Sequence, residues 1–327
     1  MPLPEIKNCP GTLAPGFGTY SQTCLKRVFG GRKVSPILPY DSPLWKEDAN
    51  DLFHDNRTHA SISGVQEKFS VVLEKNKLRL TYEGEKGTHI LKPIPGAGKN
   101  ANQMPANEHL TMQIARQVFG IETAENALIF FRNGDPAYIT KRFDVKEDGS
   151  KWAQDDFASL GERTPQTHGE HYKYKGNYLE LFLLMQRYLP AYKSEAPKLL
   201  RLLLFNYLFS NGDAHLKNFS VIETPLGDYR LSPAYDLLNS RMHVADTDFA
   251  LEDGLLPPHL AQGKILDQFH LLAKLAEISE KQVNSLVTIF LTNSDKVKIL
   301  IEASYLSEPM KRNYLQAYQK RLNKLTR

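Results

Sequence analysis

Asp213 and Asn218 are the two side chains whose types and spacing most clearly indicate chemistry. They belong to the polar run Asn211-Gly-Asp-Ala-His-Leu-Lys-Asn218, with four residues between them. Enzymes that transfer phosphoryl groups use this D-x-x-x-x-N spacing to place a carboxylate beside the acceptor hydroxyl and an amide on a metal ion. So short a pattern also occurs as a surface turn with a polar cap. The interpretation therefore depends on supporting residues elsewhere in the chain.

Asp236 is the expected second carboxylate. It follows two short apolar stretches, Phe219–Ile222 and Tyr229–Leu231, which predict a hairpin after the Asn218 loop. Mg²⁺ prefers hard oxygen ligands and takes only one or two from protein carboxylates, while phosphate and water complete its shell. Asn218 and Asp236 are therefore the predicted metal ligands, Asp213 is the predicted catalytic residue, and ATP with Mg²⁺ is the predicted cofactor pair.

The N-terminal half offers residues that could hold phosphate groups. Ser61–Lys68 is a loop of small and polar residues directly before a predicted strand, although it is neither G-x-G-x-x-G nor a Walker A loop. Lys92 ends another predicted strand and is the best candidate for a phosphate contact. Glu108, on the next predicted helix, is placed to pair with Lys92, with an exposed helix position as an equal alternative. For Ser61–Lys68 the alternative is a plain polar turn.

The elements that must position these residues fall into two groups. Residues 1–60 read as an irregular segment with one short helix, Gln22–Phe29. Short apolar runs then predict an antiparallel sheet and one helix: strands Phe69–Leu73, Lys77–Tyr82, Thr88–Lys92, Ala127–Phe131 and Ala137–Phe143, and helix Ala106–Phe119.

Beyond Asp144 the apolar periodicity becomes helical. The predicted helices are Tyr178–Leu189, Pro197–Ser210 and a run with several breaks over Leu266–Leu325. The sequence therefore predicts an α+β fold with a sheet-rich N-terminal lobe, residues 1–144, and a mainly helical C-terminal lobe, residues 145–327.

Composition excludes several other classes of protein. The 41 Lys and Arg residues nearly balance 37 Asp and Glu residues, so the net charge of +4 gives no argument for nucleic-acid binding. Cys9 and Cys24 lack metal-site spacing and are expected to be reduced and buried. No apolar run approaches the ~20 residues of a membrane span, and no signal peptide is recognisable. A cytoplasmic enzyme is expected.

Taken together, the motifs resemble those of the HipA-like serine/threonine kinases, the toxins of bacterial toxin–antitoxin systems, over most of residues 15–250. The resemblance implies a two-lobed protein-kinase-like fold, with Asp213 as catalytic base and Asn218 and Asp236 holding Mg²⁺. It also implies an ATP site formed by these residues: Ser63, Gly64, Val65, Gln66, Glu67, Lys68, Lys92, Lys141, Arg142, Phe143, His215, Lys217, Asn218, Tyr235 and Asp236.

The resemblance further implies autophosphorylation. In the family a serine of the phosphate loop is phosphorylated, and Ser61 or Ser63 corresponds to it here. The phosphate would add roughly −1.5 to −2 charge beside the place meant for ATP phosphates, which explains how it would silence the enzyme. Lys141 stands where better-known members carry an acidic residue, so the resemblance implies contact with adenine through the backbone here rather than through this side chain.

The resemblance implies a chain that is shorter at its N-terminus than full-length HipA, and the Ser-Ile-Ser loop is similar to that of the HipT branch. That branch implies a tripartite system with a small HipS-like protein and a DNA-binding HipB-like antitoxin, and contact with DNA only through the antitoxin. No membrane partner is implied. The substrates implied are aminoacyl-tRNA synthetases, glutamyl- or tryptophanyl-, whose phosphorylation inhibits translation.

Two other functions remain open from the sequence. A small-molecule phosphotransferase of kinase-like fold would use the same Asp and Asn loop. A non-catalytic binding subunit is disfavoured because the predicted catalytic residues are all present. The histidines and tyrosines of residues 167–178 predict a solvated or substrate-facing loop that shapes the cleft, rather than a metal site or a nucleic-acid surface.

Overall fold

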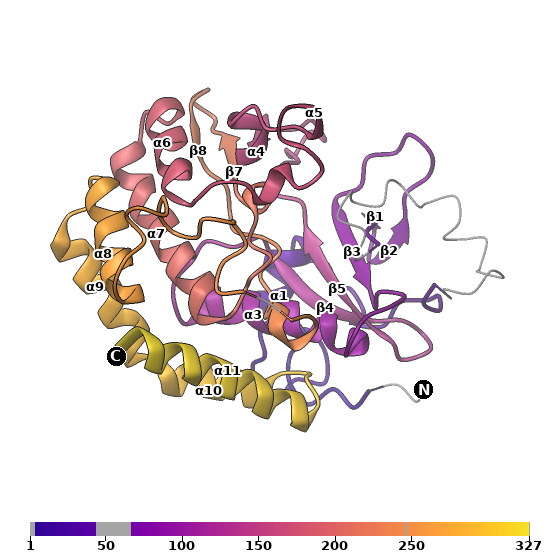
Figure 1. The fold of residues 1–327 in the computed structure, drawn as a ribbon. Coiled ribbons are helices and arrows are strands. Elements are labelled where there is room, and N and C mark those ends of the chain that lie inside the picture. Colours follow the sequence, from indigo (N-terminus) through magenta and orange to yellow (C-terminus); the bar gives the residue numbers. More distant parts are fainter. Residues whose placement is uncertain (1–3, 44–66, 246, 327) are drawn as a thin grey trace.

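The computed structural model describes residues 4–43, 67–245 and 247–326, and within them a sheet-rich part lies beside a helical part (Figure 1). The sheet is five-stranded and antiparallel throughout, in the order β2-β1-β3-β5-β4. Its strands are β1 (Phe69–Glu74), β2 (Lys77–Leu80), β3 (His89–Pro93), β4 (Asn126–Phe130) and β5 (Pro136–Lys141).

One helix covers each face of this sheet. Ala127 pairs with Ile139 and faces α1 (Gln22–Phe29), whereas the next pair along, Leu128 with Tyr138, faces α3 (Met104–Gln117). The alternation follows from the two-residue period of a strand. Ser21 caps the start of α1 by accepting the Cys24 N–H. Every residue of α3 from Met104 to Ala115 is buried, so this helix lies inside the molecule.

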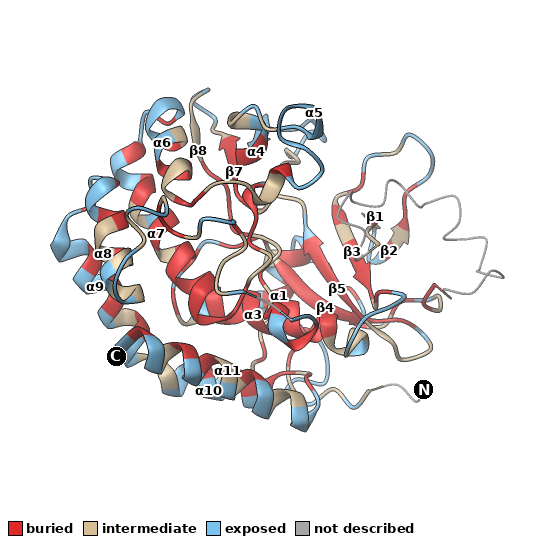
Figure 2. Ribbon diagram, viewed as in Figure 1, coloured by how far each residue is buried: buried red, intermediate tan, exposed pale blue. Residues whose placement is uncertain are grey.

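The helical part is built around α7 (Tyr192–Leu208), which is buried along most of its length (Figure 2). The other helices here are α4 (Phe157–Leu160), α5 (Pro165–His168), α6 (Leu179–Tyr188), α8 (Ile265–Leu275) and α9 (Glu280–Thr292). A small antiparallel sheet of β6 (Gln154–Asp156), β7 (Ser220–Glu223) and β8 (Tyr229–Leu231) accompanies them.

The last two helices, α10 (Ser294–Ala303) and α11 (Glu308–Thr326), run along one side of both parts (Figure 1). Asn8 Nδ2 donates to the Ala303 carbonyl at 2.8 Å, and Tyr305 packs its ring on Phe130 of the sheet at 5.6 Å between centroids. The larger hydrophobic core therefore takes residues from both sides of residue 144. The boundary between residues 1–144 and 145–327 stays a prediction.

Most predicted elements are found within a few residues of their expected ends, and Gln22–Phe29 and Tyr229–Leu231 are confirmed at both ends. One helix start was wrong. The sequence predicts a start at Pro197, but α7 begins at Tyr192 and Pro197 lies inside it. Proline removes the hydrogen bond to the carbonyl of Lys193. Because Lys193 is exposed, water can solvate that carbonyl and the helix continues.

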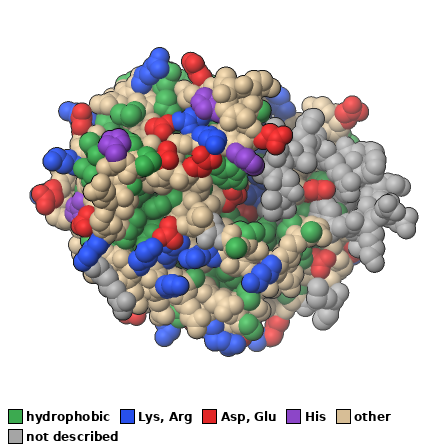
Figure 3. All heavy atoms as spheres, viewed as in Figure 1, with side chains coloured by type: hydrophobic (Ala, Val, Ile, Leu, Met, Phe, Trp, Pro, Cys, Tyr) green, Lys and Arg blue, Asp and Glu red, His purple; other side chains and the backbone are tan. Residues whose placement is uncertain are grey.

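The sequence also missed β6, α4 and α5, which are only three or four residues long. Cys9 and Cys24 are free and buried, as expected. None of the helices in the described ranges combines the length and apolar character needed to cross a membrane. Lys or Arg and Asp or Glu side chains both occur over the face drawn in Figure 3, in keeping with their near balance in the sequence.

Candidate active site

The loop after α7 is fixed in place by its own backbone. Ser210 adopts a left-handed conformation, φ 54°, which turns the chain sharply as the helix ends. Ser240 stabilises this turn. Its hydroxyl donates to the Ser210 carbonyl at 2.8 Å and accepts a hydrogen bond from the Gly212 N–H at 2.8 Å. Ala214 and Leu216 are buried in the core on the other side. Asp213 is thus held on a rigid loop rather than on a free surface turn.

Tyr174 contacts the predicted catalytic carboxylate directly. Its hydroxyl donates to Asp213 Oδ1 at 2.9 Å, from the short turn η2 (Tyr172–Tyr174). The Tyr174 ring also meets the His215 ring edge-on at 5.1 Å between centroids. The sequence predicted that this loop shapes the cleft, but it did not predict the contact between Tyr174 and Asp213, because the two residues are 39 positions apart and no local pattern links them.

Lys92 lies at the centre of a buried charged cluster. Its ammonium group is 2.6 Å from Glu108 Oε1, with side chains only 5% and 2% exposed, and it also bonds Asp236 Oδ1. Lys68 reaches the other oxygen of Asp236 at 3.4 Å. The predicted pairing of Lys92 with Glu108 is therefore present, and the alternative of an exposed Glu108 was wrong.

Burial and neighbouring charges set the ionisation of this cluster. Burial by itself would lower the pKa of Lys92, but Asp236 and Glu108 outweigh it and raise that pKa above its ordinary value. Burial would raise the pKa of Asp236, yet Lys68 and Lys92 hold it well below its usual range. For Glu108, burial prevails and raises the pKa. Lys92 and Asp236 are charged at neutral pH, as a phosphate contact and a metal ligand require.

Asp236 sits in an uncommon backbone conformation, φ 55°, that the surrounding structure must maintain. On the N-terminal side, Tyr235 donates its hydroxyl to the Lys217 carbonyl at 2.9 Å and so ties the Asp236 segment to the Asp213 loop. On the C-terminal side, the side chain of Asn107 in α3 pairs with the backbone of Asn239, at 2.9 and 3.0 Å. The Asp236 segment is thus fixed at both ends.

Asn218 fits the predicted metal role. Its Oδ1 atom is buried, and no hydrogen-bond partner for it exists in the described part of the chain. Such an orphaned acceptor is costly unless a ligand satisfies it. The described ranges contain no group of three or more His, Cys, Asp or Glu side chains able to hold a metal. A pair formed by Asn218 and Asp236 is still sufficient for Mg²⁺ bound with nucleotide, because phosphate and water supply its other ligands.

The other predicted site residues differ in their surroundings. Phe143 packs on Tyr235 at 5.9 Å between ring centroids, and Arg142 makes a two-bond pair with Asp144 at 3.0 and 2.6 Å. Lys217 pairs with Asp156 at 2.6 Å, and Lys141 is exposed.

Burial, with help from Lys173, lowers the pKa of His215 to about 3, so its ring is neutral. Glu67 is described and half-buried. The predicted residues Ser61, Ser63, Gly64, Val65 and Gln66 lie outside the described residues.

Comparison of the sequence with family models places the chain in a known family. The sequence model of the HipA-like C-terminal domain matches residues 60–293, so the chain belongs to that family. Among curated relatives, a protein of Sinorhizobium fredii (strain NBRC 101917 / NGR234) described as a candidate kinase, Y4dM, is 31% identical over 268 residues. The match covers 78% of this chain and 63% of the relative, so the chain spans less than two thirds of that protein's length.

Two solved structures are similar in fold. A chain of the Shewanella oneidensis MR-1 toxin–antitoxin complex of HipA, HipB and operator DNA matches with a TM-score of 0.62 and 21% identity, over 86% of this chain and 66% of that one. The proinflammatory kinase CtkA of Helicobacter pylori matches with a TM-score of 0.52 and 14% identity, over 78% of this chain and 92% of that one. The predicted α+β, kinase-like fold is confirmed.

Proposed function

We propose that this chain is a serine/threonine protein kinase that uses ATP and Mg²⁺. The observation that carries the proposal is the buried Lys92, held between Glu108 and Asp236, whose segment is joined to the Asp213 loop by the hydrogen bond from Tyr235 to Lys217. A buried lysine with two carboxylates is costly as a purely structural device. It is the arrangement needed to present one cation to phosphate groups and one carboxylate to a metal ion.

The residues divide the reaction between them. The acceptor hydroxyl attacks the γ-phosphorus, its proton passes to Asp213, and the bond from the γ-phosphorus to the bridging oxygen of ADP breaks. Lys92 and Lys68 contact the phosphates and balance their charge. Asn218 and Asp236 would hold Mg²⁺, which, when bound, neutralises charge on the phosphate oxygens. Tyr174 keeps one oxygen of Asp213 engaged, so the carboxylate keeps a fixed orientation toward the acceptor.

Transfer of labelled phosphate from ATP tests the proposal. Asp213→Asn preserves the shape of the side chain but removes the proton acceptor, so we expect transfer to fall at least about a hundredfold. Asp155→Asn, at an exposed position of β6, is the matched control and should transfer normally. Equal labelling by the wild type and Asp213→Asn would refute the assignment. Phosphorylation of a metabolite with no labelled protein would favour the small-molecule phosphotransferase instead.

The finer proposals follow from the family resemblance. We infer a cytoplasmic toxin of the HipT branch that phosphorylates glutamyl- or tryptophanyl-tRNA synthetase and inhibits translation, with a HipB-like antitoxin and a HipS-like protein as partners. The published name of the Shewanella oneidensis complex, which contains HipA with HipB and operator DNA, supports the antitoxin part. Incubation with ATP and each purified synthetase checks the substrate; absence of phosphoserine on both would contradict it.

Ser61 or Ser63 is the proposed site of autophosphorylation. Phosphosite mapping of the purified chain checks it, with Asp213→Asn as the inactive control. Phosphate found only at other residues would overturn the assignment.

A further inference from the structure

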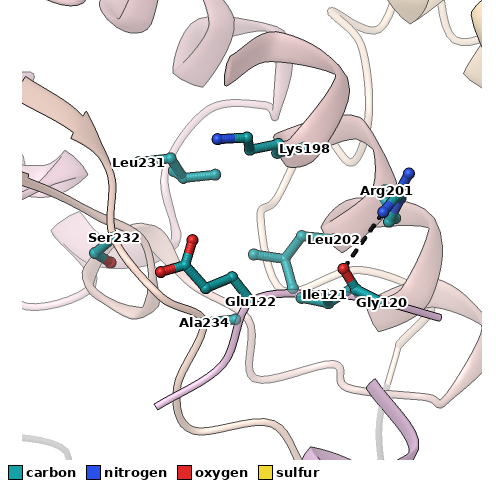
Figure 4. Close-up of a pocket in the computed structure, with 9 residues that line it drawn as sticks. All are labelled: Gly120, Ile121, Glu122, Lys198, Arg201, Leu202, Leu231, Ser232 and Ala234. Carbon is teal, nitrogen blue, oxygen red and sulfur yellow. Dashed lines mark hydrogen bonds between the residues drawn. The ribbon is translucent and has the colours of Figure 1, made fainter. Parts of the chain in front are cut away.

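A pocket of about 250 Å³ lies outside the candidate active site (Figure 4). Helix α7 lines one side of it with Lys198, Arg201 and Leu202, and the end of β8 with Ser232 faces them. The turn at Gly120–Glu122 forms the floor. Of the predicted ATP, metal and catalytic residues that the structure describes, none lines this pocket. Its volume is just below the roughly 300–1,000 Å³ typical of sites for drug-sized ligands.

Arg201 is the residue that makes this pocket unusual. Its guanidinium makes one long hydrogen bond, from Nη1 to the Gly120 carbonyl at 3.4 Å, and its Nε is buried without a partner in the described part of the chain. No carboxylate of the described residues forms an ion pair with it. Burial also lowers the pKa of Arg201. A half-buried, unpaired cation is unfavourable unless an anion compensates it.

The other charges around the pocket are already paired. Lys198 bonds Glu195 Oε1 at 2.6 Å, and Glu122 accepts two bonds from Arg230, at 2.9 and 3.0 Å. The charges within each of these pairs cancel, so the positive charge of Arg201 is left without a compensating charge at the pocket. A planar guanidinium suits two-bond recognition of a carboxylate or phosphate group.

Apart from Ser232 and the charged side chains, the lining is apolar. Leu202, Leu231 and Ala234 are buried and line the pocket together with Ile121. A bare inorganic anion would leave this surface uncovered. A ligand with an anionic head and a small apolar body would satisfy both parts of the pocket.

The pocket is physically joined to Asp236. Ala234 in its wall exchanges backbone hydrogen bonds with the floor segment, donating to the Glu122 carbonyl at 2.8 Å and accepting the Ala124 N–H at 2.9 Å. Asp236 follows two residues later in its left-handed conformation. Glu195, the partner of Lys198, also accepts the Leu231 N–H at 3.1 Å. A ligand that orders this wall therefore acts on the segment that carries Asp236.

We propose that this pocket binds a small organic anion, with Arg201 as its principal anchor, and that occupancy changes the affinity of the chain for ATP. The second part rests on the proposed function, whereas the first does not. Coupling between two sites is reciprocal, so ATP would change the affinity for the anion by the same factor.

Calorimetric titration of the full chain tests the binding. The probes are phenyl phosphate and benzoate, with benzamide as the uncharged counterpart of benzoate. We expect an anionic probe to bind with a Kd on the order of 1 mM or tighter, and benzamide not to bind. Arg201→Gln should weaken binding at least tenfold, whereas Arg187→Gln, at an exposed position of α6, should not change it. If Arg201→Gln does not fold, Lys198→Gln takes its place, with a smaller loss expected.

Further variants separate the pocket from the ATP site. Binding should survive Lys92→Met, which removes the proposed phosphate contact. Equal binding to wild type and Arg201→Gln, or no binding of either anion at about 10 mM, would overturn the site. The titration needs no turnover, so it reports on the pocket even if the chain transfers no phosphate. A KM for ATP that does not move when the probe is saturating would overturn the coupling.

Discussion

At the scale of single residues, the hydrogen bond from Tyr174 to Asp213 is the contact that adds most to the proposed catalytic mechanism. A carboxylate that accepts a proton must hold one lone pair toward the acceptor hydroxyl, and small misplacements lower the rate steeply. The hydrogen bond from Tyr174 restrains Oδ1 of Asp213. In the proposed reaction Tyr174 is a positioning residue, because it acts through Asp213.

Tyr174→Phe should lower kcat roughly tenfold, because a hydrogen bond to a charged group contributes about 1.5–3 kcal/mol. The KM for ATP should stay within about twofold, since Lys92 and Asp236 are untouched. Tyr172→Phe is the matched control: Tyr172 lies in the same turn, and its hydroxyl makes no hydrogen bond among the described residues. An unchanged kcat in Tyr174→Phe, or an equal loss in Tyr172→Phe, would show that this hydrogen bond does not orient the carboxylate.

At the scale of elements, α11 supports the candidate catalytic loop from behind. Arg321 is only 2% exposed, bonds Asp248 at 2.5 Å and lies over the ring of Tyr207 in α7 at 4.8 Å. Its Nε also reaches the Ser210 hydroxyl at 3.4 Å, at the turn that begins the Asp213 loop. One side chain thus joins the last helix, the central helix and that loop.

Arg321→Met should lower the free energy of unfolding by about 2–3 kcal/mol, because it leaves a partly buried carboxylate without its buried partner. It should also lower kcat about tenfold at temperatures where the variant is folded, since Ser210 loses a neighbour. Lys324→Met removes the second partner of Asp248, but Lys324 is 57% exposed, so the cost should stay under about 1 kcal/mol.

Urea denaturation and kinetics on both variants make the comparison. Equal losses of stability would mean that burial of Arg321 does not matter, and a normal kcat in Arg321→Met would remove its role in supporting the loop.

Local sequence patterns predicted the long elements well and the site only in part. Alternation and helical periodicity sufficed for the five-stranded sheet and for α3, because each buries one face or more against the core. The start of α7 was predicted wrongly because the preference of proline for the first turn of a helix is weaker than the tertiary packing of Tyr192. The contacts of Asp213 with Tyr174, and of Ser210 with Arg321, join distant parts of the chain, and no local signal predicts them.

At the scale of the whole molecule, buried histidines make stability depend on pH. Burial lowers the pKa of His89 and of His109 to about 4, and that of His215 to about 3. In the unfolded chain these rings take up a proton near the ordinary value of about 6.5. Between those values the unfolded state binds more protons, so stability is full above pH 6.5 and is lost as the pH falls toward 4.

His109→Gln should therefore reduce the pH dependence of unfolding. The variant should have a lower free energy of unfolding than the wild type at pH 7. This difference should shrink by roughly 2–3 kcal/mol near pH 4, where the wild type has to protonate His109 or expose it to solvent. Urea denaturation at the two pH values measures this. His168→Gln, at an exposed position, is the control, and its difference in free energy of unfolding from the wild type should be the same at both pH values. If the difference in free energy of unfolding between the wild type and His109→Gln is the same at both pH values, His109 takes up a proton as readily in the folded as in the unfolded chain.

The contact between Arg321 and Ser210 also bears on the order in which the protein matures during synthesis. The ribosome releases the Asp213 loop long before it releases residue 321, with a delay on the order of ten seconds at roughly 5–20 residues per second. During that interval the nascent chain holds the loop without the arginine behind it. The segment around Asn8 is likewise synthesised long before its partners Ala303 and Tyr305. The support behind the Asp213 loop is thus complete only after residue 321 has been synthesised.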